Sequence, residues 1–442
     1  MENEKFVKMT ETPVEKLVCT LAVPAIISML ITALYNMADT YFVGKVGTSA
    51  TAAVGVAFPL MSLIQAISFF FGHGAGNFIS RKLGAGKSDE ALRMGSSGFF
   101  LAFIVLSMIG LGCLIFIKPL SILLGASETM LSHTVKYITF ILIGAPFIGC
   151  SYVLNNLLRF QGNAFYGMIG MTTGAILNII LDPVFIFGFG MGASGAGLAT
   201  LIGQIVGCIV LLILNNKKST VKIAFKYVKF SFGVLKEIVR GGIPSLCRQG
   251  LSAIATMTLN NYAGIYGDAA IAAMSIVGRT GMMALSTVIG IGQGFQPVCG
   301  FNYGAKKYNR VKKAFWFSNN ISTLFLIVVA VFGFVFAENI IYLFRDDSDV
   351  VKIGAFALKM QCIVLPLLGF NCISNMFLQT IGKPIPATLV AMSRQFLFFI
   401  PSLIVLNSIF GLTGIQLTQT VSDLLAFFFT IPLTVTVLKR IK

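Results

Sequence analysis

The chain has 442 residues, of which 56% are hydrophobic and only 11% are charged. Soluble chains normally carry about 25% charged residues, so this composition excludes a soluble enzyme and predicts a protein that crosses the membrane many times. The net charge is +17, but the basic residues lie in short segments between apolar runs. That distribution argues against a nucleic-acid-binding face and indicates topology signals instead.

Apolar runs of about 20 residues predict membrane-spanning helices. In chain order we predict twelve of them, at residues 17–43, 52–79, 95–117, 131–157, 165–188, 194–214, 242–265, 271–299, 314–337, 353–380, 386–408 and 414–437. The predicted fold class is therefore all-α and integral to the membrane.

The longest interruption between apolar runs is residues 215–241, which carries seven Lys and Arg. We interpret it as a cytoplasmic linker that separates an N-lobe, residues 17–214 with spans 1–6, from a C-lobe, residues 242–437 with spans 7–12. Residues 1–16 and 438–442 are then a cytoplasmic N-terminal segment and a cytoplasmic tail.

The distribution of basic residues predicts the orientation. With the amino terminus inside, the inner segments hold 24 Lys and Arg and the outer segments hold five. Because cytoplasmic loops carry an excess of Lys and Arg, we expect a multi-pass protein of the cell membrane with both termini in the cytoplasm.

The two halves repeat in sequence when they are shifted by 220 residues. The shift pairs Pro24 with Pro244, Gly47 with Gly267, Gly72 and Gly74 with Gly292 and Gly294, Pro146 with Pro366, Asn155 with Asn375 and Gly162 with Gly382. Ungapped coincidences of Pro and Gly over this length indicate an internal repeat. Because each unit has six spans, we predict two lobes in the same orientation, related by an axis along the membrane normal, which is a transporter architecture.

Three acids fall well inside predicted spans, namely Asp39, Asp182 and Asp423. A carboxylate at such a depth is disfavoured by roughly 2.5–3.5 kcal/mol, so it marks a functional site by default. The repeat pairs Asp39 with Leu259 and Asp182 with Ser402, so the duplicated scaffold does not need either acid. The alternative is that both acids merely pair with a buried basic residue. We expect no such partner deep in the first six spans.

Asp182 follows Asn178 by four residues, which places a carboxylate and a carboxamide on one face of the fifth span. Pro183 removes a backbone donor and leaves the carbonyl oxygen of Ile179 without its usual partner. Together these oxygens suit a proton or a small cation. In the first span, Pro24 predicts a kink about four turns from Asp39.

The segments "PAIISMLITALYNMADTYFVGKVGTSATAAVG", "LLRFQGN", "ILNIILDPVFIFGFGMGASGAGLAT" and "GIPS" resemble the multidrug and toxic compound extrusion (MATE) family, in particular its bacterial DinF- and MepA-like type. The resemblance covers essentially the whole chain and implies exchange of protons or sodium ions for exported compounds. It implies a cation-coupling site, with Na⁺ as a possible occupant, made by Asp39, Asn178, Asp182 and Thr200. It also implies a conformational hinge at Pro24.

The C-lobe departs from some family members, which carry acids in the seventh and tenth spans. This chain has Arg248 and Lys359 in those spans, so we expect no C-lobe sodium site of that kind. Secondary candidates for a functional role are Asp423, its possible ion-pair partners Arg279 and Arg394, and Asn155. We expect Asp423 to be part of a structural ion pair.

The predicted function is a secondary active multidrug efflux antiporter. We do not expect an enzyme, because two scattered histidines do not form a set of catalytic residues. We expect no cofactor beyond the coupling ion, H⁺ or Na⁺. The expected partners are small lipophilic or cationic substrates and membrane lipid, with no nucleic acid, for a monomeric protein. The alternative is a flippase or exporter of lipid-linked precursors or other amphiphiles from the related superfamily.

Overall fold

The computed structural model describes residues 2–441. Its amino-terminal half consists of the helices α1 (Glu2–Glu11), α2 (Val14–Gly44), α3 (Thr48–Gly84), α4 (Ser88–Ile115), α5 (Ile117–Leu123), α6 (Glu128–Phe160), α7 (Ala164–Pro183), the π-helix η1 (Val184–Gly188) and α8 (Ala193–Lys218). The 3₁₀ turn η2 (Phe225–Tyr227) lies in the connection to the second half.

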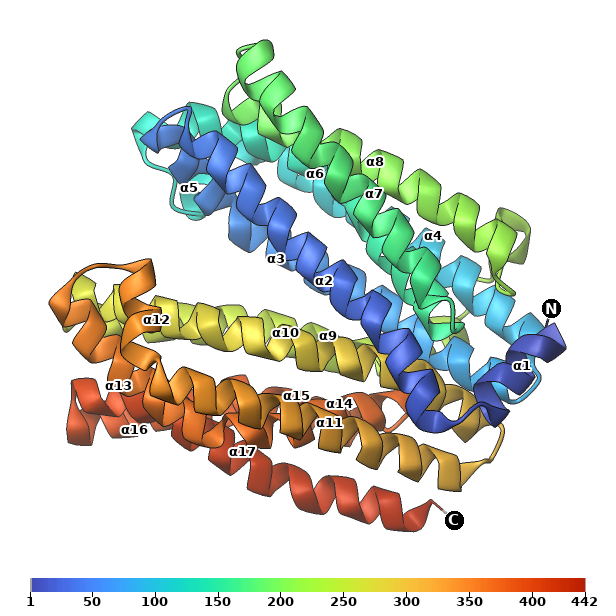
Figure 1. Ribbon diagram of the computed structural model, residues 1–442. Coiled ribbons are helices and arrows are strands. Elements are labelled where there is room, and N and C mark those ends of the chain that lie inside the picture. Colours follow the sequence, from blue (N-terminus) through green and yellow to red (C-terminus); the bar gives the residue numbers. More distant parts are fainter. Residues whose placement is uncertain (1, 442) are drawn as a thin grey trace.

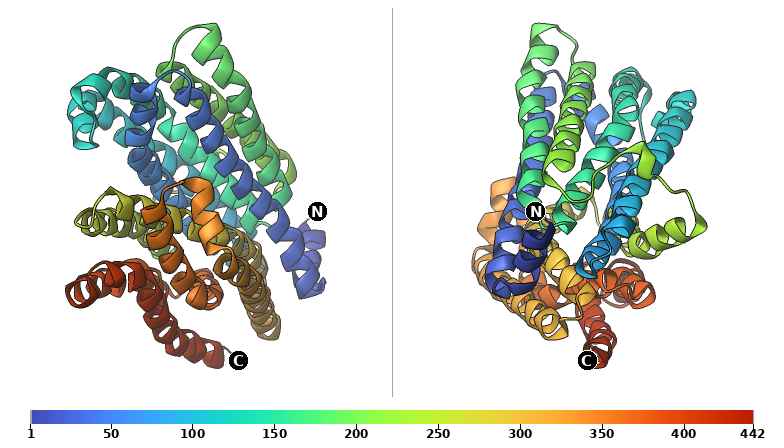
Figure 2. Two further views of the ribbon diagram at one scale, coloured as in Figure 1. Left: turned by 60° about the vertical axis from the view of Figure 1, so that its left-hand side comes forward. Right: turned by 90° about the vertical axis from the view of Figure 1, so that its right-hand side faces the viewer.

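The carboxy-terminal half consists of α9 (Phe232–Gly264), α10 (Asp268–Gly304), α11 (Tyr308–Val335), α12 (Ala337–Phe344), α13 (Ser348–Val364), the 3₁₀ turn η3 (Leu365–Leu367), α14 (Leu368–Thr380), α15 (Pro384–Met392), the π-helix η4 (Ser393–Leu397), α16 (Phe399–Phe410) and α17 (Leu412–Arg440). No strand occurs among residues 2–441. Helices α2–α8 form one bundle and α9–α17 form a second (Figure 1; Figure 2). The predicted all-α fold with two repeated lobes is confirmed.

Eleven helical segments of residues 2–441 are long and apolar enough to cross a membrane, against the twelve that we predicted. The predicted span at 242–265 is the exception. It lies within α9, which is 33 residues long. Polar residues in the middle of α9, including Arg248 and Gln249, lower its hydropathy. In addition, α9 begins at Phe232, so the last ten residues of the predicted linker are helical.

The repeat extends to elements that hydropathy did not indicate. The short helices α5 and α12 each begin two residues after the end of a long helix, and they start exactly one repeat apart at Ile117 and Ala337. Gly192 and Gly411, which precede α8 and α17, both have φ of 58°. This left-handed conformation is readily adopted only by glycine.

The two lobes touch each other along the end of the molecule that holds both termini. A Cβ atom on Gly74 would lie 2.4 Å from the carbonyl oxygen of Ile238 in α9, and one on Gly304 would lie 2.0 Å from that of Arg81 in α3. A Cβ atom on Gly294 would likewise lie 2.5 Å from the backbone nitrogen of Ala22 in α2. Toward the opposite end, where α5 and α12 lie, the ribbons of the two lobes diverge (Figure 1).

Candidate cation site in the amino-terminal lobe

Asp39 lies near the end of α2 that is remote from the chain termini, and its side chain is only 5% exposed. The hydroxyl of Tyr137, near the start of α6, donates a hydrogen bond to Oδ2 of Asp39 at 3.0 Å. The other carboxylate oxygen, Oδ1, is buried without a hydrogen-bond partner. One half of this carboxylate is therefore free to bind something else.

Asn178, Asp182 and Thr200 form the adjoining part of the site, and all three are at most 3% exposed. The Nδ2 group of Asn178 donates to Oγ1 of Thr200 at 3.2 Å and to Oδ1 of Asp182 at 3.5 Å. Oδ1 of Asn178 and Oδ2 of Asp182 are buried without a partner. Asp39 lies close enough to Asp182 for their charges to interact. The structure thus brings all four predicted residues of the cation-coupling site into one region.

Glycines explain why α8 lies close enough to α7 for this contact. A Cβ atom on Gly174 would lie 2.8 Å from the carbonyl oxygen of Gly203, and one on Gly203 would lie 3.2 Å from Cβ of Asn178. Small residues at such positions let two membrane helices approach until their backbones touch. After Asp182, the missing N–H of Pro183 interrupts the α-helical bonding, and the chain continues as the π-helix η1.

The Gly203→Ala variant is expected to separate α7 from α8 at the site. Its added methyl group would lie 2.7 Å from the carbonyl oxygen of Gly174, so the helices must move apart. We expect a loss of about 1–3 kcal/mol in stability, together with weaker export, because overpacking displaces Asn178 from Thr200. Thermal unfolding and an export assay would measure both effects. Gly112→Ala on α4 is the control, since nothing lies within 4 Å of its added Cβ, and equal losses in both variants would contradict this explanation.

The site contains three buried acceptor oxygens that receive no hydrogen bond, one each from Asp39, Asn178 and Asp182. Within residues 2–441, neither acid forms an ion pair with a Lys or Arg, as we predicted. Unpaired carboxylates in a dry environment are strongly disfavoured, so they must bind a proton or another cation. Oxygen ligands of this kind fit a proton or Na⁺, a hard cation. No group of three or more His, Cys, Asp or Glu suited to a metal ion occurs in the described part of the chain.

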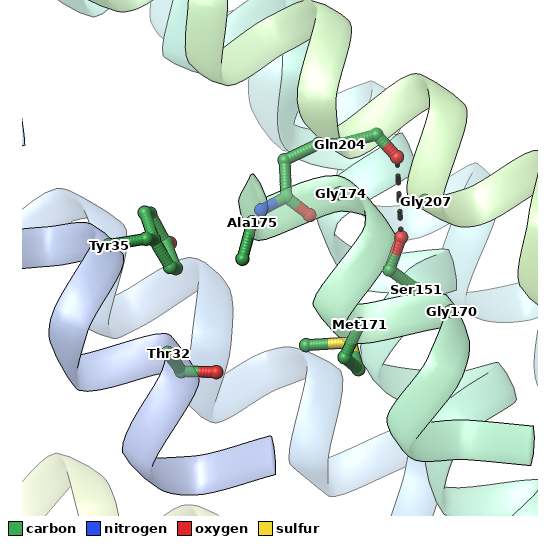
Figure 3. Close-up of a pocket in the computed structure, with 9 residues that line it drawn as sticks. All are labelled: Thr32, Tyr35, Ser151, Gly170, Met171, Gly174, Ala175, Gln204 and Gly207. Atoms are coloured by element: carbon green, nitrogen blue, oxygen red, sulfur yellow. Dashed lines mark hydrogen bonds between the residues drawn. The ribbon is translucent and has the colours of Figure 1, made fainter. Parts of the chain in front are cut away.

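A narrow pocket adjoins this site on the side toward the chain termini (Figure 3). Its lining residues are Thr32, Tyr35, Ser151, Gly170, Met171, Gly174, Ala175, Gln204 and Gly207. Tyr35, Gly174 and Gln204 are each four residues, about one helical turn, from Asp39, Asn178 and Thr200. The pocket and the cation site are therefore built by the same three helices, α2, α7 and α8. The cavity itself measures about 10 Å³, roughly the room for one water molecule, so a drug-sized compound does not fit into it in this conformation.

The match to a family model settles the family. The model, described as MatE, matches the chain twice, at residues 24–184 and 244–405. The chain belongs to the MATE family. The two matched ranges correspond to the two repeated lobes, and each MATE repeat includes the proline near the start of its first helix. Because membership of this family implies transport, the chain is a transporter rather than an enzyme, and it is an integral protein of the cell membrane.

Relatives cover nearly the whole of this MATE chain. It is 30% identical over 427 residues to a protein of Staphylococcus aureus (strain MSSA476) named "Multidrug export protein MepA", covering 94% of this chain and 92% of the relative. Two solved structures described as MATE "in the bent conformation" and "in the straight conformation" superpose with TM-scores of 0.93 and 0.92, at 26% and 25% identity. They cover 99% and 98% of this chain, respectively, and 98% of each solved chain.

The secondary candidates lie apart from the cation site. In the C-lobe, Nε of Arg394 lies 2.7 Å from Oδ1 of Asp423, which is completely buried. Gln419 donates to the same oxygen at 2.8 Å. Arg279 is exposed on α10 and does not pair with Asp423. Asn155 lies on α6 about five turns from Tyr137 and packs against Gly167, where an added Cβ atom would lie 2.4 Å from its Oδ1. It is therefore remote from the candidate site.

Pro24 lies inside α2, which runs without interruption from Val14 to Gly44. The carbonyl oxygen of Pro24 accepts a hydrogen bond from the hydroxyl of Ser28 at 2.9 Å. Two residues further on, Ile26 packs against Gly290 of α10, where an added Cβ atom would lie 2.4 Å from its side chain. The proline segment of α2 thus contacts the opposite lobe, whereas the segment around Asp39 contacts its own lobe.

Tyr137 is the site residue that our sequence analysis missed. It is completely buried and is the only hydrogen-bond partner of Asp39 in the described part of the chain. A single tyrosine in "HTVKYITF" has no distinctive spacing. The one usable signal is that a buried tyrosine hydroxyl needs a polar partner.

Proposed function

We propose that this MATE transporter exports lipophilic, often cationic, compounds in exchange for a proton or a sodium ion bound at Asp39, Asn178, Asp182 and Thr200. The observation that carries the proposal is the set of three buried acceptor oxygens without partners, in a site with no basic residue. The printed name of the staphylococcal relative, a multidrug export protein, supports the cargo class. The unequal distribution of basic residues supports cytoplasmic termini, so that the converging ends of the lobes face the cytoplasm. We also expect the transporter to act as a monomer.

Antiport requires that binding of the cargo weakens binding of the coupling ion, and the reverse. The strength of this coupling is set by how differently the cargo and the ion bind the two conformations of the protein. In our proposal, cation loading at Asp39 and Asp182 favours bending of α2 at Pro24. Because one end of α2 is packed on the C-lobe and the other on the N-lobe, such a bend reshapes the N-lobe pocket and lowers its affinity for cargo. Rocking of the two lobes on the side of the linker then returns the transporter to the inward-facing state.

We expect protons to be the driving ion, with sodium possible at the same site. Burial disfavours the charged form of a carboxyl group, so proton binding near neutral pH is well supported. Everted membrane vesicles with separately clamped gradients would decide this point. A proton gradient without sodium should drive uptake of a fluorescent cationic substrate. Rapid uptake driven by sodium alone, with the pH gradient collapsed, would assign the coupling to sodium instead.

The flippase alternative has less support, because the N-lobe pocket is lined by small, apolar and neutral polar residues. A diphosphate head group would require basic residues there. Reconstituted transporter should therefore fail to translocate a fluorescent lipid diphosphate under the gradient that drives export of the cationic substrate. Gradient-driven translocation of that lipid at a comparable rate would favour the flippase.

A further inference from the structure

Two arginines at the interface between the lobes have no acidic partner among residues 2–441. Arg159, at the end of α6, is 2% exposed, and Arg248 lies partly buried in α9. Ser245, three residues before Arg248 in α9, lies 2.8 Å from the ring of His73, and that ring lies 3.0 Å from Arg159. Two other arginines of the molecule do have an acidic residue nearby. Arg81 lies 3.6 Å from Glu237, and Arg394 pairs with Asp423.

The guanidinium of Arg159 is surrounded by neutral groups. Its Nη1 donates to Oε1 of Gln296 in α10 at 3.2 Å, and its Nη2 lies 3.0 Å from Nε2 of His73 in α3 and contacts Oδ1 of Asn156. Because arginine can only donate, Nε2 of His73 is the acceptor, and its Nδ1–H then donates to Oγ of Ser245 at 2.8 Å. The imidazole is neutral in this arrangement, so no negative charge faces Arg159.

Arg248 lies about one helical turn beyond Ser245 on α9 and joins the same network. Its Nη1 donates to Oδ1 of Asn375 in α14 at 3.1 Å, the one hydrogen bond that its guanidinium makes among residues 2–441. One turn further along α14, Gln379 donates to Oγ of Ser245 at 2.7 Å. The two helices therefore hold Arg248 beside the bonds that connect His73 to the C-lobe.

Two donors in this network lack an acceptor within the part of the chain that the structure describes. Nε of Arg159 and Nε2 of Gln296 are both buried without a partner. The two side chains are already connected by the hydrogen bond from Nη1 of Arg159 to Oε1 of Gln296. Gln296 itself is completely buried. Unsatisfied donors next to two uncompensated positive charges are strongly disfavoured in a poorly hydrated interface. Both features are relieved by one ligand, a small anion.

We propose that Arg159, Gln296 and Arg248, together called the inter-lobe arginine cluster, bind a small inorganic anion of the size of a halide. The anion accepts hydrogen bonds from Nε of Arg159 and Nε2 of Gln296, and it neutralises the charge shared with Arg248. Arg248 is the one partly exposed member of the cluster, whereas Arg159 and Gln296 are buried. Because the cluster is made by both lobes, a bound anion stabilises the conformation in which this end of the molecule is closed.

Chloride is the probe for this site. The melting temperature of the purified full-length transporter is compared in sodium chloride and sodium gluconate at equal sodium concentration and ionic strength, in nanodiscs of zwitterionic lipid. Ligand binding to the folded state should raise the wild-type melting temperature in chloride by on the order of 2 °C. The rise should be lost in Arg159→Gln and in Arg248→Gln. It should persist in Arg81→Gln, the control, which removes an interface arginine that already has Glu237 as its partner.

A melting temperature that ignores chloride, or a chloride response that survives in both Arg159→Gln and Arg248→Gln, would overturn the proposal. A rise that occurs only when anionic lipid is added would assign the cluster to a lipid head group and would equally refute a small-anion site. If Arg159→Gln fails to fold, crystals of the wild type grown with bromide provide a second measurement. An anomalous scattering peak beside Nε of Arg159 is expected, and its absence at high bromide concentration would contradict the assignment.

Discussion

The Asp39→Asn and Asp182→Asn variants are each expected to insert and fold normally and to lose gradient-driven export. Both substitutions remove charge at nearly constant shape, and each eliminates one of the two acids that can bind the coupling cation. Because coupling requires a cation that binds one state more tightly than the other, we expect export to fall by on the order of 100-fold. Efflux of a fluorescent cationic substrate from energised cells, normalised to the amount of protein in the membrane, is the measurement.

Asp268→Asn is the matched control, because this acid lies exposed at the start of α10 and outside the site. It should export like the wild type. Asp423→Asn is a second comparison, in which we expect reduced stability because Arg394 loses its buried partner. Wild-type export by either Asp39→Asn or Asp182→Asn would remove that residue from the coupling site.

Lowering the pH is expected to weaken binding of a cationic dye to the purified wild type. At high pH, ionised Asp39 and Asp182 attract the dye, whereas their protonation removes the charge and favours the cargo-releasing state. The change should be about tenfold or more, since charges a few ångströms apart in a poorly hydrated site interact by several kcal/mol. Fluorescence anisotropy titrations at a series of pH values would measure it.

The same titrations with Asp39→Asn should show weak dye binding at every pH, because the variant permanently lacks one of the two charges that attract the dye. An uncharged dye of similar size serves as the control and should respond much less to protonation. The proposed competition between cargo and cation would be refuted if the affinity of the wild type for the cationic dye depended on neither pH nor sodium. This conclusion would hold even if the protein is shown to export the dye.

The sequence predicts the lobes well because hydropathy and the Pro and Gly repeat report on backbone positions. It does not predict α5 and α12, since helices of 7 and 8 residues fall below the length of a membrane span. It also places the start of this helix at residue 242, whereas α9 begins at Phe232. In each case the missing information is tertiary, because neighbouring helices determine whether such a segment is helical.

At the candidate site, spacing within α7 is sufficient to place Asn178 and Asp182 together. Contacts between helices are not available from spacing, and Tyr137 was missed for that reason. Arg159 shows a related limit. It lies two residues beyond the predicted span at 131–157, so its position in the sequence indicates a cytoplasmic segment. However, α6 continues to Phe160 and places Arg159 in the lobe interface. Its partners His73 and Gln296 come from helices of two different lobes, so no local pattern connects them.

The contact between the lobes near the chain termini is made where glycines bring one backbone against another. A side chain can rotate and maintain partial contact as two surfaces separate, but a backbone held against a carbonyl oxygen has no such freedom. A gap of about 0.5–1 Å therefore forfeits roughly a quarter to a half of the attraction at Gly74, Gly294 and Gly304 at once. We infer that this end of the transporter has two states, sealed or open, with few intermediates between them. Such all-or-none behaviour would limit ion leakage, because a partly parted interface would be too short-lived to conduct.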